Sequence, residues 1–238
     1  MFDEVFRQLT AARGRPLIFG HRGSPRHAPE NTLESFRLAL DEGADGIEVD
    51  VQRTADGILV AHHDDMLPTN EPVASLSYEK LLPLARLAEC ELPTIEEVFK
   101  LVAGRGLMNI ELKSAGFEAE AIRLARAILP KSSYAFSSFD PRAVYACRDL
   151  APDVPALLIT FGPRDGQTDA DMLAAMDASG IACESRHLTD DLARFYRAAH
   201  LPLFAWTVNE IAEAHRLGRA GVTGLITDCP GELVKAFS

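Results

Sequence analysis

The chain has 238 residues, enough to bury a sizeable core, and we interpret it as one large domain rather than two small ones. Its formal net charge of -11 argues against a nucleic-acid or anionic-membrane partner, because phosphate backbones are bound by clustered Lys and Arg that this chain lacks. The four cysteines lie far apart and form no C-x-x-C pair, so the sequence indicates neither a zinc cluster nor a disulfide framework and fits a reducing cytoplasm.

Residues 1–16 predict a short amphipathic helix rather than a targeting segment. Asp3, Glu4 and Arg7 interrupt the apolar residues, so this segment lacks the continuous apolar core of a secretory signal. The longest apolar runs of the chain fall far short of the roughly 18 residues that a transmembrane helix needs. We therefore expect a cytoplasmic protein without stable membrane association.

Short apolar strands alternate with helical segments along the whole chain, which is typical of strand and helix units around a parallel sheet. Four residues mark expected helix starts: Asn31, Thr94, the Asp140 that precedes a proline, and Asn209. Eight strands with following helices predict a closed (β/α)8 TIM barrel, whose typical length is about 250 residues. The predicted strands are 17–20, 46–51, 107–112, 134–138, 156–159, 181–184, 203–207 and 224–227.

A ninth extended run, residues 58–63, follows an Asp-Gly dipeptide at positions 56–57, which is a strong signal for a two-residue hairpin turn. We expect this run to fold back antiparallel on the end of the second barrel strand, as a β-hairpin extension. With positions 55 and 58 facing each other, the register places Asp50 opposite His63, about 5 Å away and on the same face. His62 would then point away, so His63 is the better candidate for chemistry.

The polar candidates all fall near the carboxyl ends of predicted strands. Barrel enzymes carry their active sites at that end, and alternation along a strand places residues two apart on one face. The candidates are His21 and Arg22 after the first strand, Glu48 and Asp50 on the second, His63 after the hairpin, and Glu111 and Lys113 on the third.

Each candidate also has a purely structural interpretation. Glu48 and Asp50 would face solvent on a half-exposed strand, but a barrel strand is enclosed on both sides, which favours a metal role for them. Oxygen-only ligands favour Mg²⁺ or Ca²⁺ over zinc. His21 alone could be a hydrogen-bonded histidine beside a turn, and Glu111 with Lys113 could be an ordinary ion pair. Their joint occurrence favours a functional interpretation.

Ordered motifs across nearly the whole chain resemble those of the glycerophosphodiester phosphodiesterases, within the superfamily of TIM barrels like the phosphatidylinositol phospholipases C. This ordered agreement is far more specific than any single motif. The motifs are HRG at 21–23, PENT at 29–32, GIEVDVQRTADGILVAHHD at 46–64, LPTIEEV at 92–98, NIELK at 109–113, SSF at 137–139, WTVN at 206–209 and GVTGLITDCP at 221–230.

The resemblance implies one glycerophosphodiester phosphodiesterase domain over residues 1–238, which hydrolyses small glycerophosphodiesters to sn-glycerol 3-phosphate and an alcohol. It implies a divalent cation, Mg²⁺ or Ca²⁺, held by Glu48, Asp50 and Glu111, with His21 and His63 as acid and base. In the implied mechanism, one histidine activates the free 2-hydroxyl of glycerol for attack on phosphorus, the other protonates the departing alcohol, and water opens the cyclic phosphate.

The resemblance also gives four residues possible tasks at the substrate. Arg22 and Lys113 would balance the charge of the phosphoryl oxygens. Trp206, the only tryptophan, either packs against the glycerol carbons or is an aromatic residue of the barrel core, and Glu30 on the first loop could orient a site residue.

Residues 65–77 depart from the family pattern, and we expect the segment of about 64–93 to form a short, open cover over the site. This leaves the preferred alcohol open, along with the oligomeric state and the partners of Glu184 and Arg186. Two alternatives are a phosphodiesterase acting on lysophospholipid or inositol phospholipid, which would need an apolar rim or a basic surface, and a non-catalytic barrel that binds glycerophosphate compounds.

Overall fold

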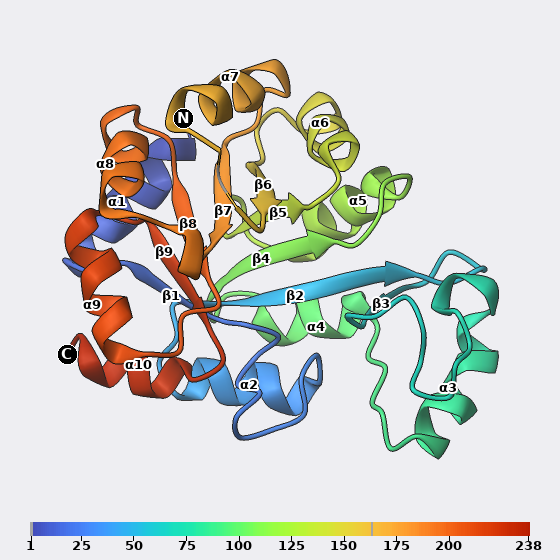
Figure 1. The fold of residues 1–238 in the computed structure, drawn as a ribbon. Coiled ribbons are helices and arrows are strands. Elements are labelled where there is room, and N and C mark those ends of the chain that lie inside the picture. The colour runs from blue at the N-terminus through green and yellow to red at the C-terminus, as the bar shows by residue number, and fades with distance from the viewer. Residues whose placement is uncertain (1, 163) are drawn as a thin grey trace.

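Eight parallel strands close into a ring, which confirms the predicted TIM barrel (Figure 1). The computed structural model describes residues 2–162 and 164–238. Strand β1 pairs with β9 on one side and with β2 on the other, and this second pairing closes the barrel. The barrel strands are β1 (Leu17–Gly20), β2 (Gly46–Arg53), β4 (Leu107–Leu112), β5 (Tyr134–Ser138), β6 (Ala156–Thr160), β7 (Gly180–Glu184), β8 (Leu203–Trp206) and β9 (Gly224–Thr227).

Helices surround the barrel and cover the outward side chains of its strands (Figure 1). The helix expected within residues 1–16 is present as α1, and no helix among the described residues has the length and apolarity to cross a bilayer. The helices are α1 (Phe2–Arg13), α2 (Leu33–Asp41), α3 (Tyr78–Leu87), α4 (Ile95–Val102), α5 (Glu118–Ile128), α6 (Pro141–Leu150), α7 (Gly166–Ala175), α8 (Asp190–Ala198), α9 (Ile211–Ala220) and α10 (Pro230–Ala236), with the 3₁₀ turns η1 (Val73–Ser75) and η2 (Ser185–His187).

The barrel interior is apolar on one side and polar on the other. Strands β2 and β4 direct buried polar side chains inward, whereas the remaining strands supply a separate apolar cluster, because alternate residues of a barrel strand face the interior. The inward polar residues of β2 and β4 are Glu48, Asp50, Asn109 and Glu111, and the apolar cluster consists of Leu17, Phe19, Ala135, Leu157, Ile159, Ala182, Phe204 and Ile226.

The predicted hairpin exists, but its register was wrong by one residue. Strand β3 (Leu59–Ala61) runs antiparallel to β2, and Val51 faces Ala61, so the N–H of His62 donates to Asp50 O at 3.1 Å. The position opposite Asp50 is therefore that of His62, not His63. The loop has three residues closed by Thr54 and Ile58. Within it only Gly57 has a positive φ, of +83°, as in a type I turn followed by a glycine bulge.

Two of the expected helix starts are confirmed. The side chain of Thr94 accepts a hydrogen bond from the N–H of Glu97, whose carboxylate accepts from Thr94 N in return, which completes a capping box before α4. Asp140 caps α6 in front of its proline.

The other two expected caps were wrong, because each asparagine bonds to a distant carboxylate. Helix α2 is capped by Thr32, and Asn31, with a φ of +55°, instead donates to Asp50 Oδ2 at 2.8 Å. Helix α9 begins after Glu210, and Asn209 donates to Asp228 at 2.7 Å.

Residues 64–93 form a small annex with its own apolar cluster, which also includes a residue of β3. In Figure 1 the annex, with α3, lies beyond the far end of the β2–β3 hairpin. None of its residues lines the cavity at the barrel mouth that is described below, so the expected cover is placed beside the site. The buried members of its cluster are Val60, Leu67, Val73, Leu81, Ala85 and Leu92.

Candidate active site

A cavity of about 220 Å³ opens at the carboxyl end of the barrel and contains most of the predicted site residues. One wall is charged and the opposite wall is apolar. Larger hollows of about 950 and 690 Å³ lie elsewhere, but no predicted site residue lines them. The cavity is lined by His21, Arg22, Glu48, His63, Asn109, Glu111, Lys113, Phe139, Ile159, Phe161, Ala182, Trp206 and Ile226.

Three buried carboxylates meet at this mouth because β2 and β4 are neighbours in register. Asp50 faces Glu111 across the two strands, and Glu48 lies two residues before Asp50 on the same face. Each of the three residues offers a carboxylate oxygen within 4.8 Å of the others. The fold therefore brings Glu48, Asp50 and Glu111 close together, as we predicted from the sequence.

Two cations lie against these carboxylates. The Nε of Arg22 lies 3.0 Å from Asp50 Oδ2, and the Nζ of Lys113 lies 3.2 Å from Asp50 Oδ1 and 2.7 Å from Glu111 Oε1. Burial opposes the charge of both cations, but the neighbouring carboxylates outweigh it and raise the pKa of Arg22 and of Lys113. Both side chains therefore remain charged, as binding of a phosphate group requires.

The pKa values of the three carboxyl groups are shifted in different directions. Burial opposes ionisation of Asp50, but Lys113, Arg22 and the Asn31 amide outweigh it and lower the pKa of Asp50. Burial raises the pKa of Glu48 well above its usual range, and the charges of Asp50 and Glu111 raise it further. The pKa of Glu111 is raised by burial and then by Asp50. When all three groups are ionised, three carboxylates against two cations leave an excess of one negative charge.

Two buried oxygens in this cluster have no hydrogen-bond donor among the described residues. Glu48 Oε2 accepts from the N–H of Arg22 at 3.0 Å, but Glu48 Oε1 has no partner, and neither has Asn109 Oδ1. Buried acceptors without a donor are unfavourable unless a donor or cation reaches them. An oxygen-only donor set with an excess negative charge fits a hard divalent cation, so these residues are suited to hold Mg²⁺ or Ca²⁺.

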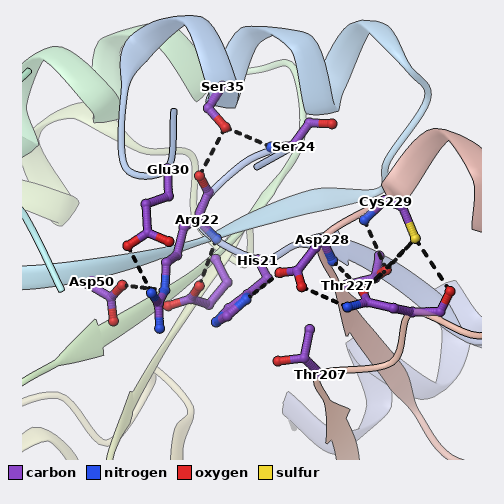
Figure 2. Close-up of polar contacts among 12 residues, drawn as sticks. His21, Arg22, Ser24, Glu30, Ser35, Asp50, Thr207, Thr227, Asp228 and Cys229 are labelled. Atoms are coloured by element: carbon purple, nitrogen blue, oxygen red, sulfur yellow. Dashed lines mark hydrogen bonds and ion pairs between the residues drawn. The ribbon is translucent and has the colours of Figure 1, made fainter. Parts of the chain in front are cut away.

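His21 is oriented by a carboxylate from the opposite end of the chain. Its Nδ1 lies 2.7 Å from Asp228 Oδ1, and Asp228, which Figure 2 shows beside His21, also accepts from the Asn209 amide at 2.7 Å. Burial opposes ionisation of Asp228, but the hydrogen bonds of His21 and Asn209 outweigh it and lower its pKa. An ionised Asp228 favours the tautomer of His21 with the proton on Nδ1, so Nε2 is free for proton transfer.

His63 also pairs its Nδ1 with a carboxylate, that of Asp64 at 2.7 Å, and lines the cavity. His62 instead directs its Nε2 to Met66 O at 3.1 Å and does not line the cavity. The preference for His63 over His62 therefore agrees with the fold, although the register from which we predicted it was wrong. Beyond Ala61 the chain leaves β3, which turns His63 toward the mouth.

The apolar wall of the mouth is aromatic. Trp206 contacts Phe139 and Phe161 edge to face, with ring centroids 5.7 and 5.5 Å apart, and donates from Nε1 to Ala182 O. The rings of Phe139 and Phe161 stack at 4.8 Å, and Phe161 is 61% exposed. Trp206 packs on the interior cluster, as expected of a barrel core aromatic, and it also lines the cavity.

Glu30 and Glu184 are placed outside the cavity lining. Glu30 pairs with Arg22 Nη1 at 2.9 Å (Figure 2). This contact can orient the guanidinium of Arg22. Glu184, for which we predicted no partner, pairs with Arg186 and lies 3.5 Å from His187.

Sequence reasoning missed Asn109, Asp228 and the pair of Phe139 and Phe161. The signal for Asp228 was the position of its motif at the end of the last strand, which closes next to the first strand in a barrel. The signal for Asn109 was its place two residues before Glu111, on the same face of β4.

The comparisons with known proteins agree with this geometry. The model of the glycerophosphoryl diester phosphodiesterase family matches residues 21–232. A glycerophosphodiester phosphodiesterase of Caldanaerobacter subterraneus is 32% identical, over 92% of this chain and 97% of the relative, and one of Bacillus altitudinis is 30% identical, over 92% and 96%.

Solved structures give the same result. An Oleispira antarctica phosphodiesterase in complex with the product sn-glycerol-3-phosphate has a TM-score of 0.83 at 25% identity, and the similarity covers 95% of this chain and 98% of that one. The fold is also that of a Thermotoga maritima glycerophosphodiester phosphodiesterase, with a TM-score of 0.79 at 24% identity over 92% and 97% of the two chains.

Proposed function

The chain belongs to the glycerophosphoryl diester phosphodiesterase family, and we propose that it hydrolyses glycerophosphodiesters to sn-glycerol 3-phosphate and an alcohol through a cyclic phosphate. The observation that carries this proposal is the meeting of His21, His63, Glu48 and Glu111 in one cavity at the barrel mouth, with Asp50 buried behind it within 4.8 Å of both glutamates. The product named for the Oleispira antarctica structure supports the same substrate class for this chain.

The two histidines are the acid and the base. In each one a carboxylate lies at 2.7 Å from Nδ1, which leaves Nε2 for the substrate. One Nε2 takes the proton of the glycerol 2-hydroxyl, whose oxygen forms a bond to phosphorus as the bond to the alcohol oxygen breaks. The other histidine protonates that departing oxygen. Water then opens the cyclic phosphate with the two roles reversed.

Charge balance explains the remaining polar residues. Arg22 and Lys113 neutralise the phosphoryl oxygens as charge builds on them. Glu48, Asp50 and Glu111 would hold a divalent cation, which when bound stabilises charge on the phosphoryl group as a Lewis acid. Without that cation the excess negative charge of the cluster repels a phosphodiester anion, so turnover requires the metal.

The test is release of sn-glycerol 3-phosphate from glycerophosphocholine and glycerophosphoethanolamine by the purified chain, with added Mg²⁺ or Ca²⁺ and with a chelator. We expect product only with a divalent cation, and equal turnover in the chelator would refute the metal requirement. Tight binding of glycerophosphodiester without product would favour the non-catalytic barrel that the sequence left open.

A lysophospholipid phosphodiesterase is the second candidate, favoured by the exposed ring of Phe161 beside Phe139 and Trp206 at the mouth. The size of the cavity argues for the smaller substrates, since about 220 Å³ lies below the roughly 300–1,000 Å³ of typical ligand pockets. Hydrolysis of lysophosphatidylcholine at a higher kcat/KM than that of glycerophosphocholine would make the lysophospholipid phosphodiesterase the favoured candidate.

A further inference from the structure

Asn109 is a buried amide at the centre of the charged wall. It is 3% exposed, it faces Glu48 across the β2–β4 pairing, and it precedes Glu111 by two residues on the same face of β4. Its side chain lines the cavity. Asn109 therefore lies between two of the three carboxylates that the proposed function assigns to the cation.

The oxygen of this amide is an exception among the amide side chains around the site. Asn31 Oδ1 accepts from the N–H of Asp50 at 3.3 Å and Asn209 Oδ1 accepts from the N–H of Asp228 at 2.9 Å, but Asn109 Oδ1 is buried without a donor among the described residues. A buried acceptor left unpaired costs about 1–3 kcal/mol. A functional site can tolerate this cost if a bound ligand supplies the missing partner of the oxygen.

The groups around Asn109 do not supply that donor. Glu48 Oε1, on the facing residue, is itself an unpaired acceptor. Lys113 is bonded to Glu111 and contacts Asp50, and Arg22 forms ion pairs with Asp50 and Glu30, although its buried Nε has no hydrogen-bond partner among the described residues. Both oxygens of Asp50 are in contact with cations or with Asn31. Glu48 Oε1 and Asn109 Oδ1, both buried without a donor among the described residues, lie on facing residues.

We infer that Asn109 Oδ1 is a further ligand of the divalent cation, next to Glu48 and Glu111, and this inference rests on the proposed function. Amide oxygens are ordinary ligands of Ca²⁺ and Mg²⁺, and a neutral oxygen adds a ligand without adding to the excess negative charge. In this arrangement Asn109 adds a fourth oxygen to the ligand set of Glu48, Asp50 and Glu111. Asn109 is thereby a determinant of metal affinity.

The test is calorimetric titration of the full chain with Mg²⁺ and with Ca²⁺, without substrate. Asn109→Leu removes the oxygen at similar size and should weaken binding by at least about tenfold, since loss of even an outer partner of a metal ligand typically costs 10–100-fold. Asn109→Asp keeps an oxygen, adds a charge and should bind the ion more tightly than the wild type. Melting curves without metal establish that each variant folds.

Ser137→Ala is the matched control. Ser137 faces Glu111 from β5 and its Oγ is also buried and unpaired, but Ser137 does not line the cavity, so its loss should leave metal affinity unchanged. Unchanged affinity in Asn109→Leu together with loss of binding in Glu48→Gln would overturn the role of Asn109 while the proposed function stands. No tightening in Asn109→Asp would also overturn it. A wild type that binds neither ion would refute the metal site of the proposed function itself.

Discussion

Glu48→Gln should make the metal-free protein more stable and at the same time abolish its stabilisation by metal. Glu48 is 3% exposed, its Oε1 has no partner, and burial followed by the charges of Asp50 and Glu111 raises its pKa. The introduced amide has nearly the same size and its oxygen can still accept from the N–H of Arg22, which now bonds to Glu48 Oε2. The substitution therefore removes the excess negative charge and little else.

Replacement of poorly compensated buried charge by neutral groups typically stabilises a protein by about 1–4 kcal/mol. In a chain of this length each kcal/mol changes Tm by about 2–4 °C, so we expect the variant to melt at least about 2 °C above the wild type without metal at neutral pH. The wild type should gain about 2.7 kcal/mol at a metal concentration of 100 times Kd, and the variant should gain almost nothing.

The pH dependence of this difference follows from the sign of the shift. A carboxyl group with a raised pKa in the folded state destabilises the fold as the pH rises from its ordinary value through the raised one. The stability advantage of Glu48→Gln should thus be smallest below about pH 4, near the ordinary range of Glu, and should grow with pH.

Thermal melts of the wild type and Glu48→Gln across pH, with and without metal, measure both effects. Glu184→Gln is the control, because Glu184 is a half-buried carboxylate whose partners, Arg186 and His187, lie outside the cavity lining. This control should show no rise in Tm and should keep the full metal shift. A Glu48→Gln protein that is less stable than the wild type without metal, or that retains the metal shift, would refute the reasoning.

Three further substitutions test the assigned roles. His21→Ala and His63→Ala should each lower kcat by about a hundredfold or more with an unchanged melting curve, and near-normal turnover in either would remove it from the acid and base pair. Asp228→Asn should lower kcat by about tenfold or more through misorientation of its histidine, whereas the surface change Asp153→Asn should not; equal rates in the two would reject the orienting role. Lys113→Met should lower kcat/KM by about 100-fold yet tighten metal binding, because its carboxylate partners lose a competing cation, and weaker metal binding would contradict this.

The fold could be predicted because its signals are local and repeat eight times. Alternation of apolar strands and capped helices predicted the barrel, and residues two apart on one strand had to share a face. The hairpin register could not be fixed in this way. The same Asp-Gly dipeptide fits a loop of two or of three residues. The two-residue loop would place His63 opposite Asp50, whereas the three-residue loop places His62 there.

The site was predicted where motif and fold coincide, and missed where partners are distant in sequence. Glu111 was expected beside Asp50 because adjacent parallel strands bring their carboxyl ends together. His21 and Asp228 are 207 positions apart, and Asn31 was read as a helix cap because Asn is a common cap. Such pairings depend on the closed barrel rather than on any local pattern.

The most direct test of the central claim follows two phosphodiesters by ³¹P NMR in the presence of the purified chain and Mg²⁺ or Ca²⁺. One is glycerophosphocholine and the other is its analogue without the 2-hydroxyl of glycerol. We predict that the first is converted to sn-glycerol 3-phosphate through a transient cyclic phosphate and that the second is not cleaved. Cleavage of both at similar rates would contradict attack by the substrate hydroxyl.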